Sequence, residues 1–422
     1  MHYVIVGAGP AGVVAAEALR KVDPQGDISL LDRHGEPPYS RMAIPYYLAG
    51  NIAEEGTHLR KEEGHFEKLG IQLVNQGIRK VSPADRHITL DDGSQLQYDK
   101  LLLATGSHPL TPPIPGVDNP GVLPCWELEH AREIVKRAKP GAKVALIGAG
   151  FIGCIILEAL ALRKVELAVI EMGPRMVPRM MDEKAGAMIK AWCEDKGVAV
   201  YTDTQVEAIE AAQGAQPLNV VLPGGKRLPA DLVITATGVG ANTAFLKGSG
   251  IKVDQGILVD EFMQTSDANV FAAGDCAQGC DFSTGERSVH AIQPTAVDHG
   301  RIAALNMAGQ SVPYKGSVNM NVLDTIGLIS TSFGLWMGAK GGDCIELHDP
   351  ERFRYLNLQF KDDVLVGATS LGMTEHVGVL RGLIQSQVPL GPWKDKLLVD
   401  PTRVMEAYLA RCGTSAQAAA SA

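Results

Sequence analysis

Two stretches of the chain repeat one order of apolar, glycine and helix-forming positions. Residues 2–32 begin with the apolar run YVIV, continue through a glycine-rich turn and a helical period to about Val22, and end in the run ISLL. Residues 143–171 repeat this order, from KVALI through a second glycine-rich turn and a helical period to about Arg163, to the run ELAVI. This order is typical of strand, turn, helix and strand in a parallel sheet. We therefore predict a duplicated α/β unit.

The pattern changes after Pro313. The segments SVNMNVLDTIGLIS, YLNLQF and VLVGATSLG alternate as strands do, and a helical period follows from Thr374 to Gln387, which predicts a C-terminal α+β domain. Between the two repeats the segment SHPLTPPIPGVDNPGVLP contains six prolines, which predicts irregular backbone and a domain boundary near Pro113. The small, aperiodic residues 413–422 predict a disordered tail or a cloning remnant.

Composition narrows the function. The 422 residues contain 39 Lys and Arg against 48 Asp and Glu, so the net charge is −9, which argues against nucleic acid as the main partner. Aromatic residues make up only 5% of the chain, so platforms for base stacking are few. Glycine is abundant at 46 residues, which directs attention to the glycine-rich turns.

The cysteines and the N-terminus bear on location. Seven scattered cysteines do not form a disulfide framework, so we expect a reducing, cytoplasmic environment. The N-terminus MHYVIVGAG lacks the basic region of a secretory signal and is expected to be a strand. Residues 144–162 approach the length of a membrane span, but three glycines divide them into strand, turn and helix, so no membrane span is expected.

The first glycine-rich turn has the spacing of a phosphate cradle. Gly7 suits the tight turn, Gly9 lets the backbone touch a pyrophosphate, and Gly12 lets the helix pack closely on the strand. Asp32, 20 residues past Gly12, is placed to accept hydrogen bonds from the ribose of an adenosine. The alternative is a tight turn without a ligand, but the flanking strand, helix and acid favour a dinucleotide site.

The second turn repeats the spacing with Gly148, Gly150 and Gly153, and its second strand ends in Glu171. An acid at this place accepts from a free 2′-hydroxyl and repels a 2′-phosphate, which favours NAD over NADP. Arg175 lies four residues further on and is expected to weaken that preference. The alternative is a structural repeat whose second site holds no coenzyme.

Over nearly its whole length the chain resembles the pyridine nucleotide-disulfide oxidoreductase superfamily, which comprises FAD flavoproteins with an inserted NAD domain. The resemblance rests on the two glycine fingerprints and on the segments LLLATGSHP, ITATGVGANT and TSDANVFAAGD. It implies two Rossmann-like domains and a C-terminal α+β interface domain. The implied segments are 1–112 with 242–312 for FAD, 113–241 for NAD and 313–412 for the C-terminal domain.

The resemblance also implies the residues at each coenzyme. For NAD they are Gly148, Gly150, Phe151, Ile152, Gly153, Glu171 and Gly238. For FAD they are Gly7, Gly9, Pro10, Ala11, Gly12, Asp32, Arg33, Arg41, Ile78, Ala104, Thr105, Gly106, Asp275, Pro294, Thr295 and Ala296. Asp275 ends an apolar run, and in the family an FAD ribityl hydroxyl is its donor; a helix N-cap is the alternative.

Within the superfamily, the segment PPYSRMAIPYYLAG is similar to the branch of rubredoxin and ferredoxin reductases, nitrite reductase flavin domains and NADH oxidases. Met42 stands where the thiol-dependent members carry their redox-active cysteine, and a thioether forms no thiolate. Tyr46 takes the place of a lysine that ferredoxin reductases often put near the flavin. Ile155 replaces the usual glutamate near the nicotinamide, with Glu158 one helical turn later as the substitute neighbour.

A helix is expected to open around Gln293, and it resembles the family helix whose N-terminus faces the flavin pyrimidine. His290 and His299 flank that N-terminus, either as proton carriers or, more simply, as structural hydrogen-bonding residues. Cys276 and Cys280 have the C-x3-C spacing of a redox pair or of two iron–sulfur ligands. Since no second pair accompanies them, two unconnected thiols is the favoured interpretation, and no metal site is expected.

These observations predict an FAD-dependent oxidoreductase that prefers NADH. Without a thiol at Met42, it is expected to exchange electrons with a rubredoxin, a ferredoxin or the iron–sulfur subunit of a larger complex. The direction of transfer is open, and both a homodimer and a hetero-oligomer are compatible with the sequence. The alternative enzyme is an oxidase or reductase acting on oxygen, peroxide or a quinone. A flavoprotein sensor or scaffold is the third class.

Overall fold

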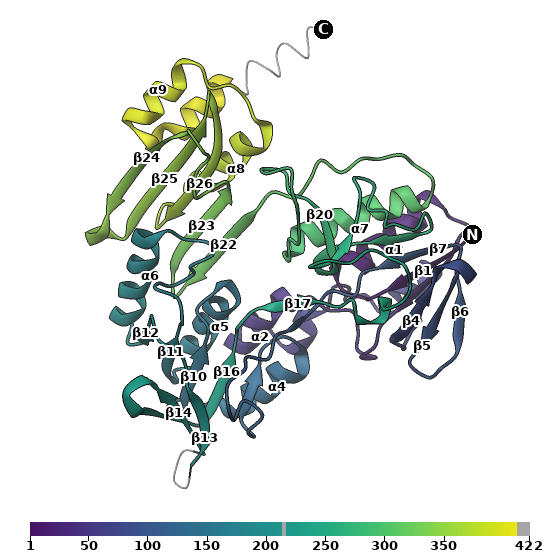
Figure 1. Cartoon of the computed structure of the whole chain (residues 1–422), viewed down its shortest axis with the longest axis horizontal. Helices are drawn as coiled ribbons and strands as arrows, with labels where there is room; N and C mark the ends of the chain where they lie inside the picture. Colours follow the sequence, from purple (N-terminus) through teal and green to yellow (C-terminus); the bar gives the residue numbers. More distant parts are fainter. Residues whose placement is uncertain (213–216, 412–422) are drawn as a thin grey trace. The chain divides into compact units, whose positions relative to one another are not determined.

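The computed structural model describes residues 1–212 and 217–411, so the predicted tail at 413–422 lies outside the described residues. The chain divides into two compact units (Figure 1). Unit 1 comprises Met1–Leu110, Trp126–Leu128 and Val239–Ser317, and unit 2 comprises Thr111–Cys125, Glu129–Gly238 and the chain from Val318 onward. Most of the predicted NAD-binding and C-terminal segments therefore belong to the same unit.

Unit 1 is built on a parallel five-stranded sheet in the order β19-β7-β1-β2-β3. The first repeat supplies β1, α1 and β2, and buried apolar side chains on these elements form much of the core. The bounds are β1 His2–Val6, α1 Pro10–Val22, β2 Asp27–Leu31, β3 Ile71–Val74, β7 Lys100–Leu103 and β19 Val270–Ala272.

Smaller elements complete unit 1. The antiparallel sheet β4-β5-β6 spans Ile78–Ser82, His87–Leu90 and Gln95–Gln97, and β8 (Ser107–Pro109) pairs with β17 (Val239–Ala241). The third small sheet is β18 (Ile257–Leu258), β20 (Ala277–Cys280) and β21 (Arg287–Ser288). The helices are α2 (Ile44–Ala49), α3 (His65–Lys68) and α7 (Gln293–Met307), the last beginning at the predicted residue.

Unit 2 repeats the parallel architecture in the order β12-β11-β10-β16-β9. Its second repeat folds as predicted, with the helix ending one residue before Arg163. The bounds are β9 Val122–Pro124, β10 Lys143–Ile147, α5 Phe151–Leu162, β11 Glu166–Ile170, α6 Glu183–Asp195, β12 Ala199–Tyr201 and β16 Leu232–Thr235. An antiparallel sheet of β13 (Ala208–Ala211), β14 (Leu218–Leu222) and β15 (Lys226–Ala230) and the helix α4 (Leu128–Arg137) are also present.

The remainder of unit 2 is an antiparallel sheet in the order β22-β23-β26-β25-β24, with helices packed on it (Figure 1). The alternating segments after Pro313 thus form strands as predicted, and β24 and α9 are additions to that prediction. The bounds are β22 Met320–Thr325, β23 Leu328–Gly334, β24 Asp343–Asp349, β25 Arg354–Lys361, β26 Val364–Leu371, α8 Val377–Ser386 and α9 Pro392–Val399. Among the described residues, no helix is long and apolar enough to cross a membrane.

Helices α1 and α7 lie side by side in unit 1 (Figure 1). Gly300 permits this closeness, because a Cβ atom built there would lie 2.2 Å from the carbonyl oxygen of Ala11. A real Cβ atom cannot approach a backbone oxygen so closely, so the helices would have to separate. The contact couples the start of α1, where the first glycine-rich turn ends, to α7.

We expect Gly300→Ala to lower the free energy of unfolding by about 1–3 kcal/mol, because the added methyl overpacks a backbone contact. Gly378→Ala in α8 is the matched control, since a Cβ atom there has no neighbour within 4 Å. The free energy of unfolding of the control should rise by up to about 1 kcal/mol, because alanine has a higher helix propensity than glycine. Denaturant unfolding measures both, and equal stabilities for the two variants would contradict this packing.

Candidate dinucleotide sites

The first glycine-rich turn is shaped by backbone contacts within unit 1. Gly7 has a φ of +109°, and a Cβ atom there would lie 2.2 Å from the carbonyl oxygen of Ala104. A Cβ atom at Gly12 would lie 1.9 Å from the carbonyl oxygen of Gly7. At Gly9 the same atom would have no neighbour within 4 Å, so the outer side of the turn is open. The turn is therefore crowded toward the protein and open where a phosphate would lie.

The amides of this turn and the helix after it are available to a ligand. Gly9 is the N-cap of α1, Pro10 occupies the first turn, and no side chain caps the helix. Uncapped amides and the positive end of a helix dipole form an anion site. Asp32 accepts hydrogen bonds from the amides of His34 (3.0 Å) and Gly35 (3.1 Å) through Oδ2, while Oδ1 has no partner among the described residues. This geometry fits a dinucleotide with its pyrophosphate at α1 and its ribose at Asp32.

Arg41 lies beside the strand exit at residues 104–106. Its guanidinium stacks 5.2 Å from the ring centroid of Trp126, and Nη1 is 3.4 Å from where a Gly106 Cβ atom would be. Nη2 is 3.9 Å from the Glu127 carboxylate, but the buried Nε has no hydrogen-bond partner in the described chain. An unpaired buried donor calls for an acceptor. The residues present therefore suit a polar or anionic group of a ligand.

Asp275 is oriented toward the same region. Ser107 Oγ donates to its Oδ2 at 2.8 Å. Burial raises the pKa of the Asp275 carboxyl, and the Ser107 hydrogen bond and the Arg41 charge offset that rise only in part. The chain continues from Asp275 into strand β20, so the helix N-cap considered from the sequence is wrong. Asp275 remains a candidate acceptor for a ligand hydroxyl.

The start of α7 closes this site from another element. A Cβ atom at Gly274 would lie 3.3 Å from Ala11 Cβ and 3.4 Å from Ala296 Cβ, which puts the first turns of α1 and α7 against one loop. Pro294 lies in the first turn of α7, Thr295 and Ala296 are buried, and Ser40 Oγ donates to the Gln293 side chain. The structure therefore brings the predicted residues of α1, α7 and the Asp275 loop together.

Other predicted FAD residues have partners within the protein. Arg33 forms an exposed ion pair with Asp91 (Nε to Oδ2, 3.2 Å) and reaches the carbonyl oxygen of Ile78 at 3.4 Å. Thr105 Oγ1 donates to the carbonyl oxygen of Asn242 at 2.9 Å, and the side-chain Nδ2 of Asn242 donates to the carbonyl oxygen of Thr105 at 2.8 Å. These contacts stabilise the loops, and their roles toward FAD stay predictions.

Met42 and Tyr46 are exposed apolar side chains four residues apart, at the junction between a 3-10 turn and α2. Their exposed fractions are 43% and 58%. The position that holds a cysteine in thiol-dependent flavoproteins is therefore open in this unit and carries a thioether. No reactive sulfur stands there.

The second glycine-rich turn repeats the first within unit 2. Gly148 has a φ of +103°, and its Cβ atom would lie 2.4 Å from the carbonyl oxygen of Ala236. A Cβ atom at Gly153 would lie 2.1 Å from the carbonyl oxygen of Gly148, and at Gly150 it would meet nothing within 4 Å. Gly150 is the N-cap of α5 without a side-chain cap, so the helix start at Phe151 and Ile152 is available to a phosphate.

Glu171 is only 8% exposed, and both of its oxygens accept backbone hydrogen bonds. Ala149 donates to Oε2 and Gly173 donates to Oε1, each at 2.7 Å. Arg175, by contrast, donates to the carbonyl oxygens of Met181 (2.8 Å) and Pro178 (3.3 Å). Its guanidinium is thus engaged with its own loop, which argues against its expected weakening of the NAD preference.

Glu158 contacts the C-terminal part of unit 2. Its carboxylate accepts a hydrogen bond from the amide of Ile326, and burial and the charge of Asp324 raise its pKa. These contacts supply a structural role that the sequence pattern did not indicate, and its predicted place beside the nicotinamide stays a prediction. Gly238, the last predicted NAD residue, has a φ of +109° that favours glycine.

The remaining candidates, two cysteines and two histidines, contact other groups of unit 1, and their roles stay predictions. Burial raises the pKa of the Cys276 thiol, whose Sγ contacts the carbonyl oxygens of Leu103 and Ala273, and Cys280 is also a free thiol. His290 pairs with Asp281 at 3.0 Å, and burial lowers the pKa of His299 to about 4. The described residues contain no cluster of three or more metal-ligating side chains.

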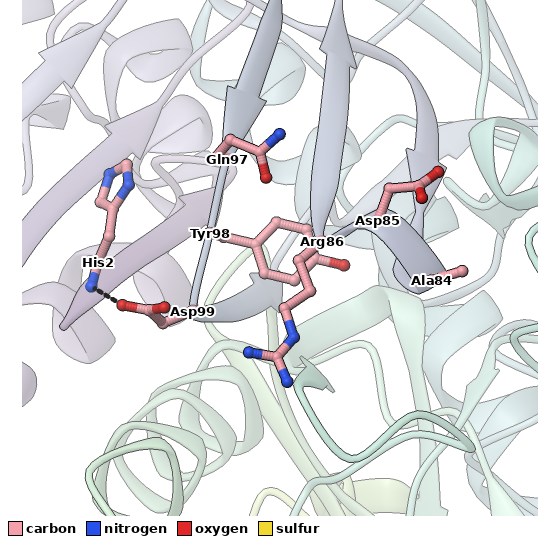
Figure 2. A pocket seen from close by; sticks show the side chains of 7 residues that line it. All are labelled: His2, Ala84, Asp85, Arg86, Gln97, Tyr98 and Asp99. Atoms are coloured by element: carbon pink, nitrogen blue, oxygen red, sulfur yellow. Dashed lines mark hydrogen bonds between the residues drawn. The ribbon is translucent and has the colours of Figure 1, made fainter.

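A surface pocket of about 340 Å³ opens in unit 1 beside His2, at the end of β1 remote from the glycine turn (Figure 2). The Tyr98 hydroxyl has no partner in the described chain, and Asp99 accepts from the amide of His2 at 2.7 Å. None of the predicted coenzyme residues lines it. Within unit 1 the pocket is therefore separate from the first glycine-rich turn.

Known proteins are similar to this chain over most of its length. Residues 1–300 match the family described as pyridine nucleotide-disulphide oxidoreductase. The chain is 33% identical over 407 residues to the NADH-dependent phenylglyoxylate dehydrogenase subunit epsilon of Aromatoleum evansii, covering 95% of this chain and 96% of that one. It is 32% identical over 336 residues to an NADH oxidase of Methanocaldococcus jannaschii, covering 76% and 73%. The crystal structure of the covalent putidaredoxin reductase–putidaredoxin complex superimposes with a TM-score of 0.87 at 26% identity, covering 97% and 99%.

We expect Asp275→Asn to weaken FAD binding and to stabilise the FAD-free protein at neutral pH. Burial in the folded state raises the pKa of this carboxyl above its ordinary value, so its ionisation lowers the stability as the pH rises from the unfolded-state pKa to the folded-state pKa, and the full cost is present above the folded-state pKa. The stabilisation should therefore vanish in acid, where the carboxyl is protonated in both states. Thermal unfolding against pH and flavin fluorescence titration measure the two effects, and unaltered FAD affinity would contradict the assignment.

We expect the unaltered enzyme to favour NADH over NADPH, and Glu171→Ala to narrow the ratio of their kcat/KM values. Alanine removes the charge that repels a 2′-phosphate together with the acceptor for the amides of Ala149 and Gly173. The kcat/KM for NADH should fall by about tenfold, which corresponds to the loss of one hydrogen bond to a charged group. Equal kcat/KM for both coenzymes in the unaltered enzyme would be inconsistent with this role.

Proposed function

Because the chain belongs to the pyridine nucleotide-disulphide oxidoreductase family, we propose that it passes electrons between NADH and a one-electron carrier protein. Family members bind FAD and NAD(H), and the chain is an NADH oxidoreductase. The observation that carries the proposal is the combination of two intact dinucleotide turns with a methionine at residue 42. Such a protein has the means to accept a hydride and lacks the thiol that would accept its electrons.

The proposed FAD site lies in unit 1. The amides at the start of α1 would bind the pyrophosphate, Asp32 the adenosine ribose and Asp275 a ribityl hydroxyl. Arg41 would donate its unpaired Nε to the cofactor, and the positive end of α7 would favour negative charge on the flavin ring. Bound FAD supplies the conversion of two-electron hydride transfer into one-electron steps.

The proposed NAD site lies in unit 2. The amides at the start of α5 would bind the pyrophosphate, and Glu171 would accept from the 2′-hydroxyl of the adenosine ribose. Ile155 has no polar side-chain group, whereas the superfamily usually has a glutamate at this position. The nicotinamide is therefore expected to be held by backbone and apolar contacts more than by a charged side chain.

A protein sulfur is not needed in this route. The Cys276 thiol is fully buried, and its raised pKa disfavours the thiolate that would attack or donate. Its Sγ contacts the backbone carbonyl oxygens of Leu103 and Ala273, and Cys276 is a free thiol. Cys280, the other cysteine of the C-x3-C spacing, is also a free thiol. We propose that neither Cys276 nor Cys280 carries electrons.

The proposed partner is an iron–sulfur or rubredoxin-type protein, either separate or as a subunit of one complex. A relative of nearly equal length is described as subunit epsilon of an NADH-dependent dehydrogenase, and a similar reductase was solved in covalent complex with putidaredoxin. Both are compatible with a flavoprotein that acts through a protein partner. Transfer in either direction uses the same residues.

The second candidate is an NADH oxidase, favoured by the relative from Methanocaldococcus jannaschii. Steady-state assays with NADH and oxygen against NADH and a one-electron dye separate the two functions. The proposal expects the dye to be reduced much faster than oxygen, and the reverse would favour the oxidase. Purification from the native source with identification of co-purifying iron–sulfur proteins then tests the partner.

We expect a Cys276→Ser, Cys280→Ser variant with bound FAD to retain NADH-to-dye turnover within about twofold, since no thiolate takes part. Anaerobic reductive titration of the unaltered enzyme should consume about two electrons per FAD, as a flavin alone requires. An uptake near four electrons, or loss of turnover in the flavin-loaded variant, would revive the cysteines as a redox pair. The single Cys276→Ser variant is the control for packing.

A further inference from the structure

Val177 has an unusual backbone conformation in the loop that follows β11. Its φ is +47°, and its side chain is only 1% exposed. Left-handed backbone is strained for a β-branched residue, because Cβ and its branches crowd the neighbouring carbonyl groups. Such strain persists only where surrounding contacts hold it, and it is concentrated at functional sites. The contacts of Val177 therefore indicate what the strain supports.

The backbone of Val177 links its own loop to the second glycine-rich turn. Its amide donates to the carbonyl oxygen of Ala149 at 2.8 Å. Its carbonyl oxygen accepts from the amides of Met180 (2.9 Å) and Met181 (3.0 Å), which closes the loop on itself. Arg175 adds hydrogen bonds to this loop through its guanidinium. The donor to Ala149 is thus held by a closed, internally bonded segment.

The other side of Ala149 is held as well. Its amide donates to Glu171 Oε2 at 2.7 Å, so both polar groups of this buried residue have partners that follow β11. Glu171 is itself fixed by the amide of Gly173. The middle of the turn between Gly148 and Gly150 is therefore held on both sides by groups of the protein itself.

The first glycine-rich turn lacks this arrangement. Ala8 is the residue equivalent to Ala149, and within the described chain its amide and carbonyl groups have no such partners. Asp32, equivalent to Glu171, accepts instead from His34 and Gly35 of its own loop. The two repeats thus share their glycines and differ in how the turn is held.

We propose that Val177 is a positioning residue for NADH, holding the second turn in its binding conformation through Ala149. This inference rests on the proposed function, in which NAD occupies the second turn and FAD the first. NADH must bind and leave in every turnover, whereas FAD remains bound. A turn that is already ordered binds without the cost of ordering, which benefits the coenzyme that exchanges. The FAD turn can be ordered once, by FAD itself.

The first experiment measures the NAD+ dissociation constant of the FAD-loaded enzyme by calorimetry. Val177→Pro removes the donor and excludes a positive φ, so we expect about a tenfold or greater rise in Kd. Val177→Gly keeps the donor and adopts the left-handed conformation freely, so its Kd should stay within about threefold even if lost side-chain packing lowers its unfolding temperature. FAD content should stay parental in both variants.

Lys164→Pro is the matched control. Lys164 also has a positive φ (+59°), and its amide donates to Ala161 at 2.9 Å, but it lies beyond the far end of α5. The control should lose stability and keep the parental Kd. A parental Kd in folded Val177→Pro, or equal losses in the Gly and Pro variants, would overturn the proposal. If the unaltered enzyme itself binds no NAD+, the proposed function fails instead.

Hydrogen exchange on the unaltered holoenzyme gives a test that needs no variant. We expect the peptide around Ala149 to be protected without NAD+ and to change little when NAD+ is added. The peptide around Ala8 should gain protection only when FAD is added to the FAD-free protein. Rapid exchange around Ala149 that slows on adding NAD+ would show a turn ordered by its ligand and would overturn the proposal, even if Val177→Pro did not fold.

Discussion

The structure depends on close backbone contacts at the two glycine-rich turns. At Gly7 and at Gly148 a Cβ atom would lie 2.2 Å and 2.4 Å from a carbonyl oxygen of the neighbouring parallel strand's exit. Only glycine permits this approach, and the approach brings the strand end, the helix start and the adjacent strand exit to one point. Uncapped amides then face outward together. Each dinucleotide site is a consequence of that packing.

The duplicated unit has diverged in the parts around the turn. In unit 1 the site is extended by Arg41, Asp275 and the start of α7, which together offer an unpaired donor, a buried acceptor and a helix dipole. In unit 2 the turn is fixed by Glu171 and Val177. A tightly held cofactor benefits from many contacts, and an exchanging coenzyme benefits from an ordered turn. The divergence matches those two demands.

Local signals in the sequence predicted the repeated elements well, because strand, turn and helix within each repeat depend on residues near one another. The helix to Val22, the strand before Glu171 and the helix at Gln293 all follow from period and glycine spacing. The same local signals did not predict the contacts that join distant segments. The Arg41 stacking on Trp126, the Ile326 amide at Glu158 and the Ala149 link to Val177 connect segments whose proximity only the fold establishes.

In the proposed function, one chain retains FAD in its first site and exchanges NAD at its second. Native mass spectrometry of the purified chain tests this directly, before and after exhaustive buffer exchange and again after NAD+ is added. We predict that a mass increment of one FAD survives the exchange and that one further NAD+ binds and is removed by a second exchange. A chain that carries no flavin from a flavin-replete host, or that takes up FAD at both sites, would contradict the account.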